Sequence, residues 1–176
     1  MNPSDKKHVW KINIRASVQD VWAELTKRGI VQRAMFDTVL ESDLKVGSKL
    51  AYRTPNGKRT FIVGDVLEAD PPRRLVHTFA FIDLPDSPTR VMYELNDLGG
   101  SVELVVTHDQ FEGETPTFKR VSGGWPSILN NLKCVVEHGQ VPFRTRLQYA
   151  MMKAMMVFMP LGPYDKQRRS CGGADR

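Results

Sequence analysis

A chain of 176 residues with 41% apolar residues is long enough for one domain with a sizeable core, and no apolar run reaches the roughly 18 residues of a membrane span. The first thirty residues contain no signal-like apolar block, so a cytoplasmic location is expected. The net charge of +5 belongs to residues 143–176, while residues 1–142 hold 18 basic and 18 acidic residues, which argues against a nucleic-acid partner.

The chain opens with a predicted strand and a short predicted helix. Residues 8–16, HVWKINIRA, alternate apolar and polar side chains with a period of two, which is typical of a strand. Ser17 has the character of a helix N-cap, with Asp20 three residues further on. The helix that follows is expected to end near Gly29, and a second helical turn is expected over residues 30–35.

Residues 37–111 are rich in β-forming runs separated by turn signals. The runs are TVLES, KLAYRT, RTFIVGDVLEA, RRLVHTFAF, TRVMYELND and SVELVVTHDQF. The pairs Asn56-Gly57 and Gly99-Gly100 are typical of tight hairpins, and short connections make neighbouring strands antiparallel. With the first strand, these runs predict an antiparallel sheet of about six or seven strands, one face of which must be covered.

One longer helix follows, in the segment SGGWPSILNNLKCVVEHG. Its apolar residues recur at helical spacing, and Gly139 is a typical stop. The helix could begin near residue 117, or at Pro126, since proline suits the first helical position. Both starts remain open. In either case a helix ending near residue 138 can cover the apolar face of a curved sheet.

The order of elements and four segments together resemble a known superfamily. SVQDVWAELT, DLKVGSKLAYRTPNGK, VLEADPPRRLVHTF and GGWPSILNNLKCVVEHG lie in register over residues 8–139. The chain is identified as a member of the SRPBCC (START-like, helix-grip) superfamily, in the branch related to activators of the heat-shock-protein-90 ATPase. The resemblance implies an α+β helix-grip fold, in which a curved antiparallel sheet wraps a long C-terminal helix, often around an apolar cavity. It fixes no single function, because this fold serves carriers, cyclases, sensors and chaperone partners.

No group of residues in the sequence has the pattern of a catalytic or metal site. His77 and His108 lie at apolar strand positions and could share a cavity, but they lack metal-ligand spacing. Cys134 has no identifiable base, and Cys171 lies in a polar tail, so neither a nucleophile nor a disulfide framework is indicated. Glycine-rich phosphate loops are absent as well. We expect no catalytic residue, no metal and no cofactor.

Binding of an apolar small molecule, without catalysis, is the function that the sequence favours. Ligand pockets are mostly apolar with a few orienting polar groups, and five residues on the strands and at the helix entry fit that description: Tyr52, His77, Tyr93, His108 and Trp125. The same residues could instead fill a solid core. Two other functions remain open: a chaperone-associated partner in a stress response, as the resemblance implies, and a polyketide cyclase or dehydratase with His77 or His108 as general base.

Residues 143–176 form a basic, methionine-rich extension outside the resemblance. Five of the eight methionines fall between Leu147 and Met159, and this segment predicts a helix to about residue 159. The helix could cover its own domain or a second copy, giving a homodimer. Alternatively it could contact a membrane surface or a partner, anchored by basic residues. The first is preferred, because a large exposed apolar stripe is a liability in a soluble protein. Residues 1–142 are expected to fold by themselves as the helix-grip domain.

Overall fold

The computed structural model describes residues 6–158 and 162–171. Its strands are β1 (His8–Ile14), β2 (Val31–Gln32), β3 (Thr38–Ser42), β4 (Lys49–Arg53), β5 (Thr60–Asp70), β6 (Arg74–Phe81), β7 (Thr89–Asp97) and β8 (Val102–Asp109). Its helices are α1 (Val18–Thr26), the 3-10 helix η2 (Arg33–Met35), α2 (Pro116–His138), α3 (Phe143–Phe158) and α4 (Pro163–Cys171). The predicted end of the tail helix near residue 159 thus falls at the edge of the described residues.

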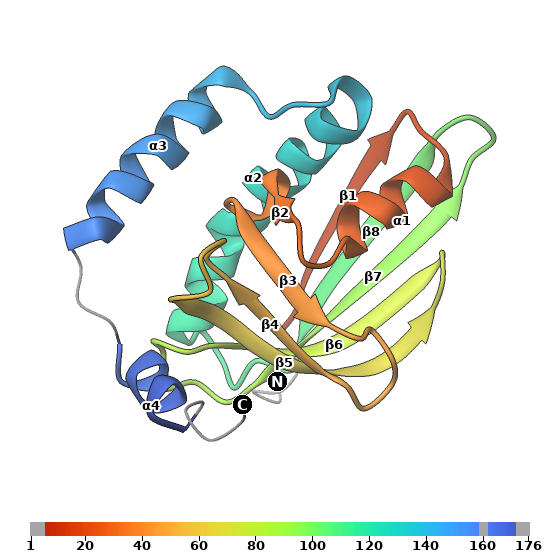
Figure 1. Ribbon diagram of the computed structural model, residues 1–176. Helices are drawn as coiled ribbons and strands as arrows, with labels where there is room; N and C mark the ends of the chain where they lie inside the picture. The colour runs from red at the N-terminus through yellow and green to blue at the C-terminus, as the bar shows by residue number, and fades with distance from the viewer. Residues whose placement is uncertain (1–5, 159–161, 172–176) are drawn as a thin grey trace.

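The strands form one curled antiparallel sheet in the order β1-β8-β7-β6-β5-β4-β3-β2. Figure 1 shows α2 lying along the concave side of this sheet, with α3 turning back along the outside of the domain. The main core fills the space between sheet and helix, where buried side chains such as Leu104, Val106 and Leu129 are less than 5% exposed. The predicted α+β helix-grip fold is confirmed, with eight strands where six or seven were expected.

The additional strand occupies the place of the predicted second helical turn. Val31 and Gln32 pair with the beginning of β3 as the two-residue strand β2, and only Arg33–Met35 form a 3-10 turn. Phe36 and Asp37 then adopt left-handed backbone angles, each with φ of 55°. This tight reversal brings the chain back beside itself, so backbone pairing with β3 replaces the helical hydrogen bonds.

Helix α2 begins at Pro116, ten residues before Pro126, so the predicted start at Pro126 is wrong and the start near residue 117 is right. The Thr115 hydroxyl accepts a hydrogen bond from the Phe118 N–H at 3.2 Å, and Pro116 takes the first helical position. Pro126 lies inside the helix, where it removes a backbone donor. Both Pro126 and Ser122, four residues earlier, are exposed, so water can satisfy the carbonyl group of Ser122.

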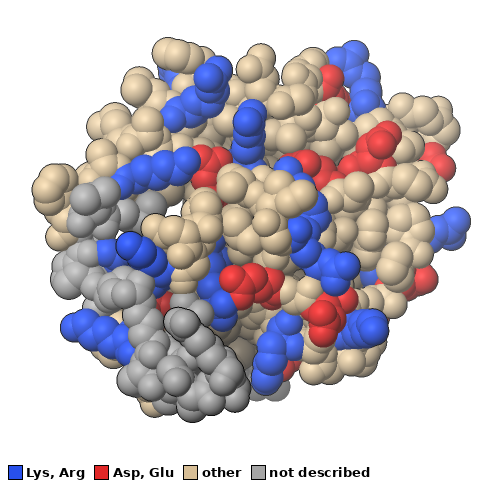
Figure 2. Space-filling view, in the orientation of Figure 1, with Lys and Arg blue, Asp and Glu red and all other residues tan. Residues whose placement is uncertain are grey.

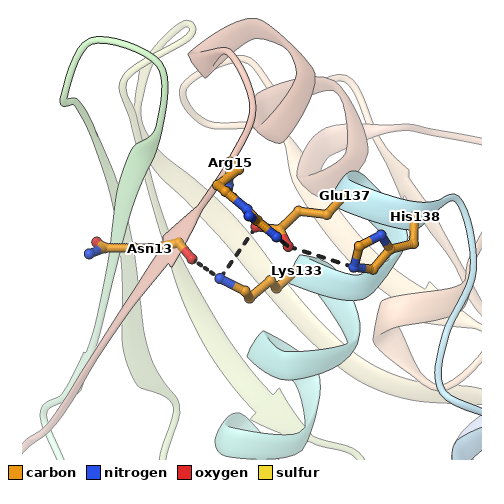
Figure 3. A network of polar contacts seen from close by, with 5 residues as sticks. All are labelled: Asn13, Arg15, Lys133, Glu137 and His138. Atoms are coloured by element: carbon orange, nitrogen blue, oxygen red, sulfur yellow. Dashed lines mark hydrogen bonds and ion pairs between the residues drawn. The ribbon is translucent and has the colours of Figure 1, made fainter.

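The C-terminal end of α2 is fastened to β1 by the polar network of Figure 3. The carboxylate of Glu137, whose side chain is 5% exposed, accepts a hydrogen bond from the Arg15 N–H at 2.7 Å. Lys133 donates to the Asn13 carbonyl group and lies 3.3 Å from the same carboxylate. Because two positions one helical turn apart hold Asn13 in β1 and Arg15 just after it, the helix is fixed against the edge of the sheet.

Strand β5 approaches β6 closely at Gly64, before a register shift between Val66 and Glu68. Beside Gly64, the Asp65 N–H donates to the Thr78 hydroxyl at 2.8 Å. A Cβ atom on Gly64 would lie 1.9 Å from the carbonyl oxygen of Thr78. The two backbones therefore approach so closely that only glycine fits, and a register shift such as the one that follows bends a strand.

We expect Gly64→Ala to destabilise the protein by about 3 kcal/mol, the upper end for overpacking, because the added methyl group meets backbone rather than a movable side chain. Gly123→Ala is the matched control, since a Cβ at this helical position meets nothing within 4 Å. The control should gain about 0.5–1 kcal/mol from the better helix former. Urea unfolding followed by circular dichroism measures both, and two variants of equal stability would contradict the close approach.

A candidate ligand cavity between the sheet and helix α2

An apolar cavity of about 260 Å³ lies between the concave side of the sheet and α2. Strands β4, β5 and β6 supply one wall, α2 supplies another, and η2 with the residues after it closes one side. The lining residues are Met35, Phe36, Thr38, Tyr52, Phe61, Ile62, Phe79, Phe81, Arg120, Val121, Gly124, Trp125, Ile128 and Met152. The volume suits a compact small molecule.

The spacing of the lining residues follows from the periods of the elements that carry them. Phe79 and Phe81 are two residues apart on β6, so both rings lie on the same face of the sheet, and they meet edge to face at 4.9 Å. Gly124 and Ile128 are four residues apart on α2 and therefore share one side of the helix. Gly124 leaves open space at the wall, since a Cβ there would meet nothing within 4 Å.

Most polar atoms in the lining are already used by the protein. The Thr38 hydroxyl donates to the Met35 carbonyl group at 2.6 Å, and the Trp125 indole N–H donates to His108 at 3.1 Å. Arg120 is the one charged residue in the lining, and its side chain is 45% exposed. Its guanidinium lies 4.7 Å from the centre of the Phe81 ring and donates through Nη1 to Asp83 at 2.9 and 3.0 Å. The cavity is thus an apolar chamber with one cationic group among its lining residues.

Two buried tyrosines reach each other from strands β4 and β7. The hydroxyl groups of Tyr52 and Tyr93 form a hydrogen bond, and burial raises the pKa of both phenols. Tyr52 lines the cavity, whereas Tyr93 lies behind it, against Trp125 with ring centres 5.8 Å apart. The two phenols are therefore neutral and paired, and of the two only the Tyr52 ring contributes to the cavity wall.

His108 is a fully buried structural histidine. Its Nδ1 accepts from Trp125, so Nε2 carries the proton and donates to the Thr89 hydroxyl at 2.7 Å. Thr89 in turn donates to the Phe79 carbonyl group at 3.0 Å. Burial, with smaller contributions from neighbouring histidines, lowers the pKa of His108 to about 3. Both ring nitrogens are occupied, which leaves no free lone pair for proton transfer.

His77 is also fully buried but has one free nitrogen. Its Nδ1 donates to the Thr78 carbonyl group at 2.7 Å, and among the described residues Nε2 has no hydrogen-bond partner. Burial lowers the pKa of His77 to about 4, against a smaller opposing effect of the bond to Thr78. Val91 lies between His77 and His108 in the sheet register, so the two histidines belong to one row across β6, β7 and β8.

The five residues singled out from the sequence fall into two groups. Tyr52 and Trp125 line the cavity, while Tyr93, His77 and His108 are buried outside its lining. Trp125, 3% exposed, packs at the junction of sheet and helix and also lies 6.1 Å from Trp10, ring centre to ring centre. The sequence analysis missed the wall formed by phenylalanines of β5 and β6, because nothing distinguishes a phenylalanine that lines a void from one that fills a core.

Met152 belongs to α3, so the extension takes part in the cavity wall. Tyr149 anchors this helix: its ring is 2% exposed, its hydroxyl accepts from the Asn131 side chain at 3.1 Å, and it packs on Phe36. Lys153 adds an ion pair with Asp37. One face of α3 therefore covers its own domain.

Helix α4 is held by a buried carboxylate. Asp165, 2% exposed, accepts from the Thr60 N–H at 3.0 Å, at the beginning of β5. No group of three or more His, Cys, Asp or Glu side chains among the described residues could hold a metal ion. Cys134 is a half-buried free thiol, and the side chain of Cys171 lies outside the described part.

Comparison of the sequence with family models gives one match. The model described as "Activator of Hsp90 ATPase homolog 1-like protein" matches residues 15–137, about two thirds of the chain. No curated protein sequence matches. The match contains β2 to β8, α1 and nearly all of α2; β1 precedes it, and it ends before α3 begins.

Solved structures from several organisms are similar in fold. An HSP90 activator from Plasmodium falciparum has 20% identity and a TM-score of 0.62 over 74% of this chain and 95% of its own. CalU16 from Micromonospora echinospora has 21% identity and a TM-score of 0.62 over 87% and 89%. The Aha1 dimer from Colwellia psychrerythraea has 20% identity and a TM-score of 0.63 over 76% and 98%. At these identities the likeness concerns the fold.

Proposed function

Because the chain belongs to the family of Activator of Hsp90 ATPase homolog 1-like proteins, we propose that it uses the family's fold to bind a compact apolar small molecule without catalysing a reaction on it. The observation that carries the proposal is the cavity of about 260 Å³ with its almost wholly apolar lining. Apolar surface removed from water supplies the driving force, on the order of 25 cal/mol per Å². Arg120, whose Nη1 donates to Asp83, is the one charged residue in the lining.

The positions of the two buried histidines, His77 and His108, favour ligand binding over catalysis. A general base needs an accessible lone pair within hydrogen-bond reach of the substrate. His108 has none, and His77 is not among the residues that line the cavity. The cyclase or dehydratase hypothesis would therefore need a different proton acceptor, and none of the lining residues is an acid or a histidine.

Filling the cavity should abolish binding. Gly124→Leu places a side chain into open space at the cavity wall, so it should weaken binding of the neutral probe N-phenyl-1-naphthylamine by at least about tenfold, with the fold intact. Gly123→Leu is the matched control, because the neighbouring glycine is equally free of contacts and does not line the cavity. Probe fluorescence measures the affinity.

Equal probe affinity in the Gly124 and Gly123 variants would mean that the probe binds outside this cavity, and it would contradict the proposal. Circular dichroism of both variants distinguishes lost binding from lost folding. Turnover by the wild-type protein in a substrate screen, lost in a His77→Gln variant, would instead favour the enzyme hypothesis.

A second candidate function is a chaperone partner in a stress response in the cytoplasm. The observations that favour it are the family match and the likeness to a structure named as an HSP90 activator. A chaperone would bind to the outer surface of the protein and not inside the cavity. Gly124→Leu should therefore leave a chaperone complex intact while it abolishes binding in the cavity, which separates the two functions.

A further inference from the structure

Helix α3 has two opposed apolar faces, of which only one is covered. Tyr149 and Met152 face the domain, as described above. The opposite face carries five large apolar side chains spaced by three or four residues: Phe143, 75% exposed, Leu147, 55%, Met151, 62%, Met155, 65%, and Phe158, 88%. This spacing aligns them in one stripe along the helix. The interpretation that the tail helix buries its apolar face on its own domain thus accounts for half of the helix.

The concentration of these side chains is unusual within the molecule. Of the 11 large apolar side chains that are exposed in the described part of the chain, five lie on this one helix. The others are distributed over β1, loops, β5 and α4. Single exposed apolar residues need no explanation, whereas a contiguous stripe marks a contact surface.

The charges around the stripe have a single sign. Arg144 and Arg146 are exposed on α3 and Lys166 is exposed on α4, whereas Lys153 is paired with Asp37 of the domain. Asp165 is the one acidic residue in the described part of both helices, and it is buried against the Thr60 N–H. Figure 2 shows mainly uncharged and basic surface over α3, the helix at the upper left of Figure 1.

These charges decide between the possible occupants of the stripe. A second copy of the chain would present the same basic face and no acidic residue to pair with the arginines. Anionic lipid headgroups provide that pairing, and the acyl region beneath them takes up apolar side chains. We propose that the outer face of α3 docks on an anionic bilayer surface, with the helix lying in the plane of the interface.

The proposed contact is peripheral. Among the described residues, no helix combines the length and the apolar character needed to cross a bilayer. Tyr149 holds the inner face of α3 on the domain through Asn131, so the helix is presented as a fixed edge of the protein. Binding of α3 to the bilayer does not depend on whether the cavity holds a ligand. The Gly124→Leu variant should therefore bind vesicles like the wild type.

The test is cosedimentation of the full-length protein with vesicles of phosphatidylglycerol and phosphatidylcholine, compared with phosphatidylcholine alone. We expect binding to the anionic vesicles that falls as salt rises. Replacing Arg144 and Arg146 by Gln should weaken it by about fivefold for each arginine. The double variant Met151→Gln/Met155→Gln should abolish it. Val46→Gln/Leu98→Gln, which changes exposed apolar residues elsewhere, is the control and should bind like the wild type.

Equal binding to anionic and neutral vesicles would overturn the proposal. So would vesicle binding by the Met151→Gln/Met155→Gln variant at the wild-type level. A failure to bind any vesicle would do so as well. A concentration-dependent dimer that is lost in the Met151/Met155 variant, with no vesicle binding, would show instead that this face joins two copies of the chain. Because the substituted side chains are exposed, unchanged circular dichroism is expected and confirms that each variant is folded.

Discussion

Acidification from pH 7 to pH 4.5 should destabilise the protein by about 5 kcal/mol through His77 and His108 alone. A histidine in the unfolded chain titrates near 6.5, whereas burial lowers the pKa of His77 to about 4 and that of His108 to about 3. Between these values the unfolded chain binds more protons than the folded protein. The stability is therefore fully present above the unfolded pKa and is lost as the pH falls below it, by about 2.5 kcal/mol per histidine at pH 4.5.

Urea unfolding at a series of pH values measures this loss. His108→Gln should flatten the dependence by about half, since an amide can accept from Trp125 and donate to Thr89 without titrating. His138→Gln is the control, because that ring is exposed at the end of α2. An unchanged pH dependence in the His108 variant would mean that this ring is protonated as readily in the folded protein as in the unfolded chain.

Trp125→Ala should cost about 3–5 kcal/mol of unfolding free energy, the range for truncation of a large aromatic side chain in a core. The ring is 3% exposed and packs between sheet and helix against Trp10 and Tyr93. Its removal also leaves Nδ1 of His108 without a donor, and an unpaired buried acceptor adds to the loss. The same substitution opens the cavity towards the row of histidines.

Denaturant unfolding followed by far-ultraviolet circular dichroism checks this expectation, since tryptophan fluorescence changes with the substitution itself. Trp125→Phe separates the two contributions: it keeps most of the packing and removes only the indole donor. A loss within about 0.5 kcal/mol for the alanine variant would contradict a buried ring and would place Trp125 at a movable surface.

The elements that the sequence predicted best are those whose period extends over several residues. The alternation in β1 and in β6 to β8 located each strand, and Ser17 marked the beginning of α1 through its hydrogen bond from the Asp20 N–H at 3.1 Å. β2 was not predicted because two residues are too few to show a period. Its pairing depends on a reversal at Phe36 and Asp37, and left-handed backbone angles are uncommon for phenylalanine.

The start of α2 and the site were harder to predict for different reasons. Proline permits two positions, the first turn or an exposed interior site, and only the cap formed by Thr115 decides between them. For the site, side-chain chemistry identified Tyr52 and Trp125 but also selected His77 and His108, whose roles depend on burial and tautomer. Met152 could not be found at all, because its place in the wall results from how α3 packs.

The position of Met152 in the cavity wall has a consequence for how the cavity could change between related proteins. Strands β2 to β8 and nearly all of α2 lie within the family match, residues 15–137, whereas Met152 lies beyond it. Exchanging residues of α3 can therefore reshape the chamber while the buried tyrosines, histidines and Trp125 stay as they are. Under the proposed binding function, a change at Met152 would alter the ligand preference through the extension, whereas the tyrosine pair of β4 and β7, the buried histidines and Trp125 all belong to the part of the chain that matches the family.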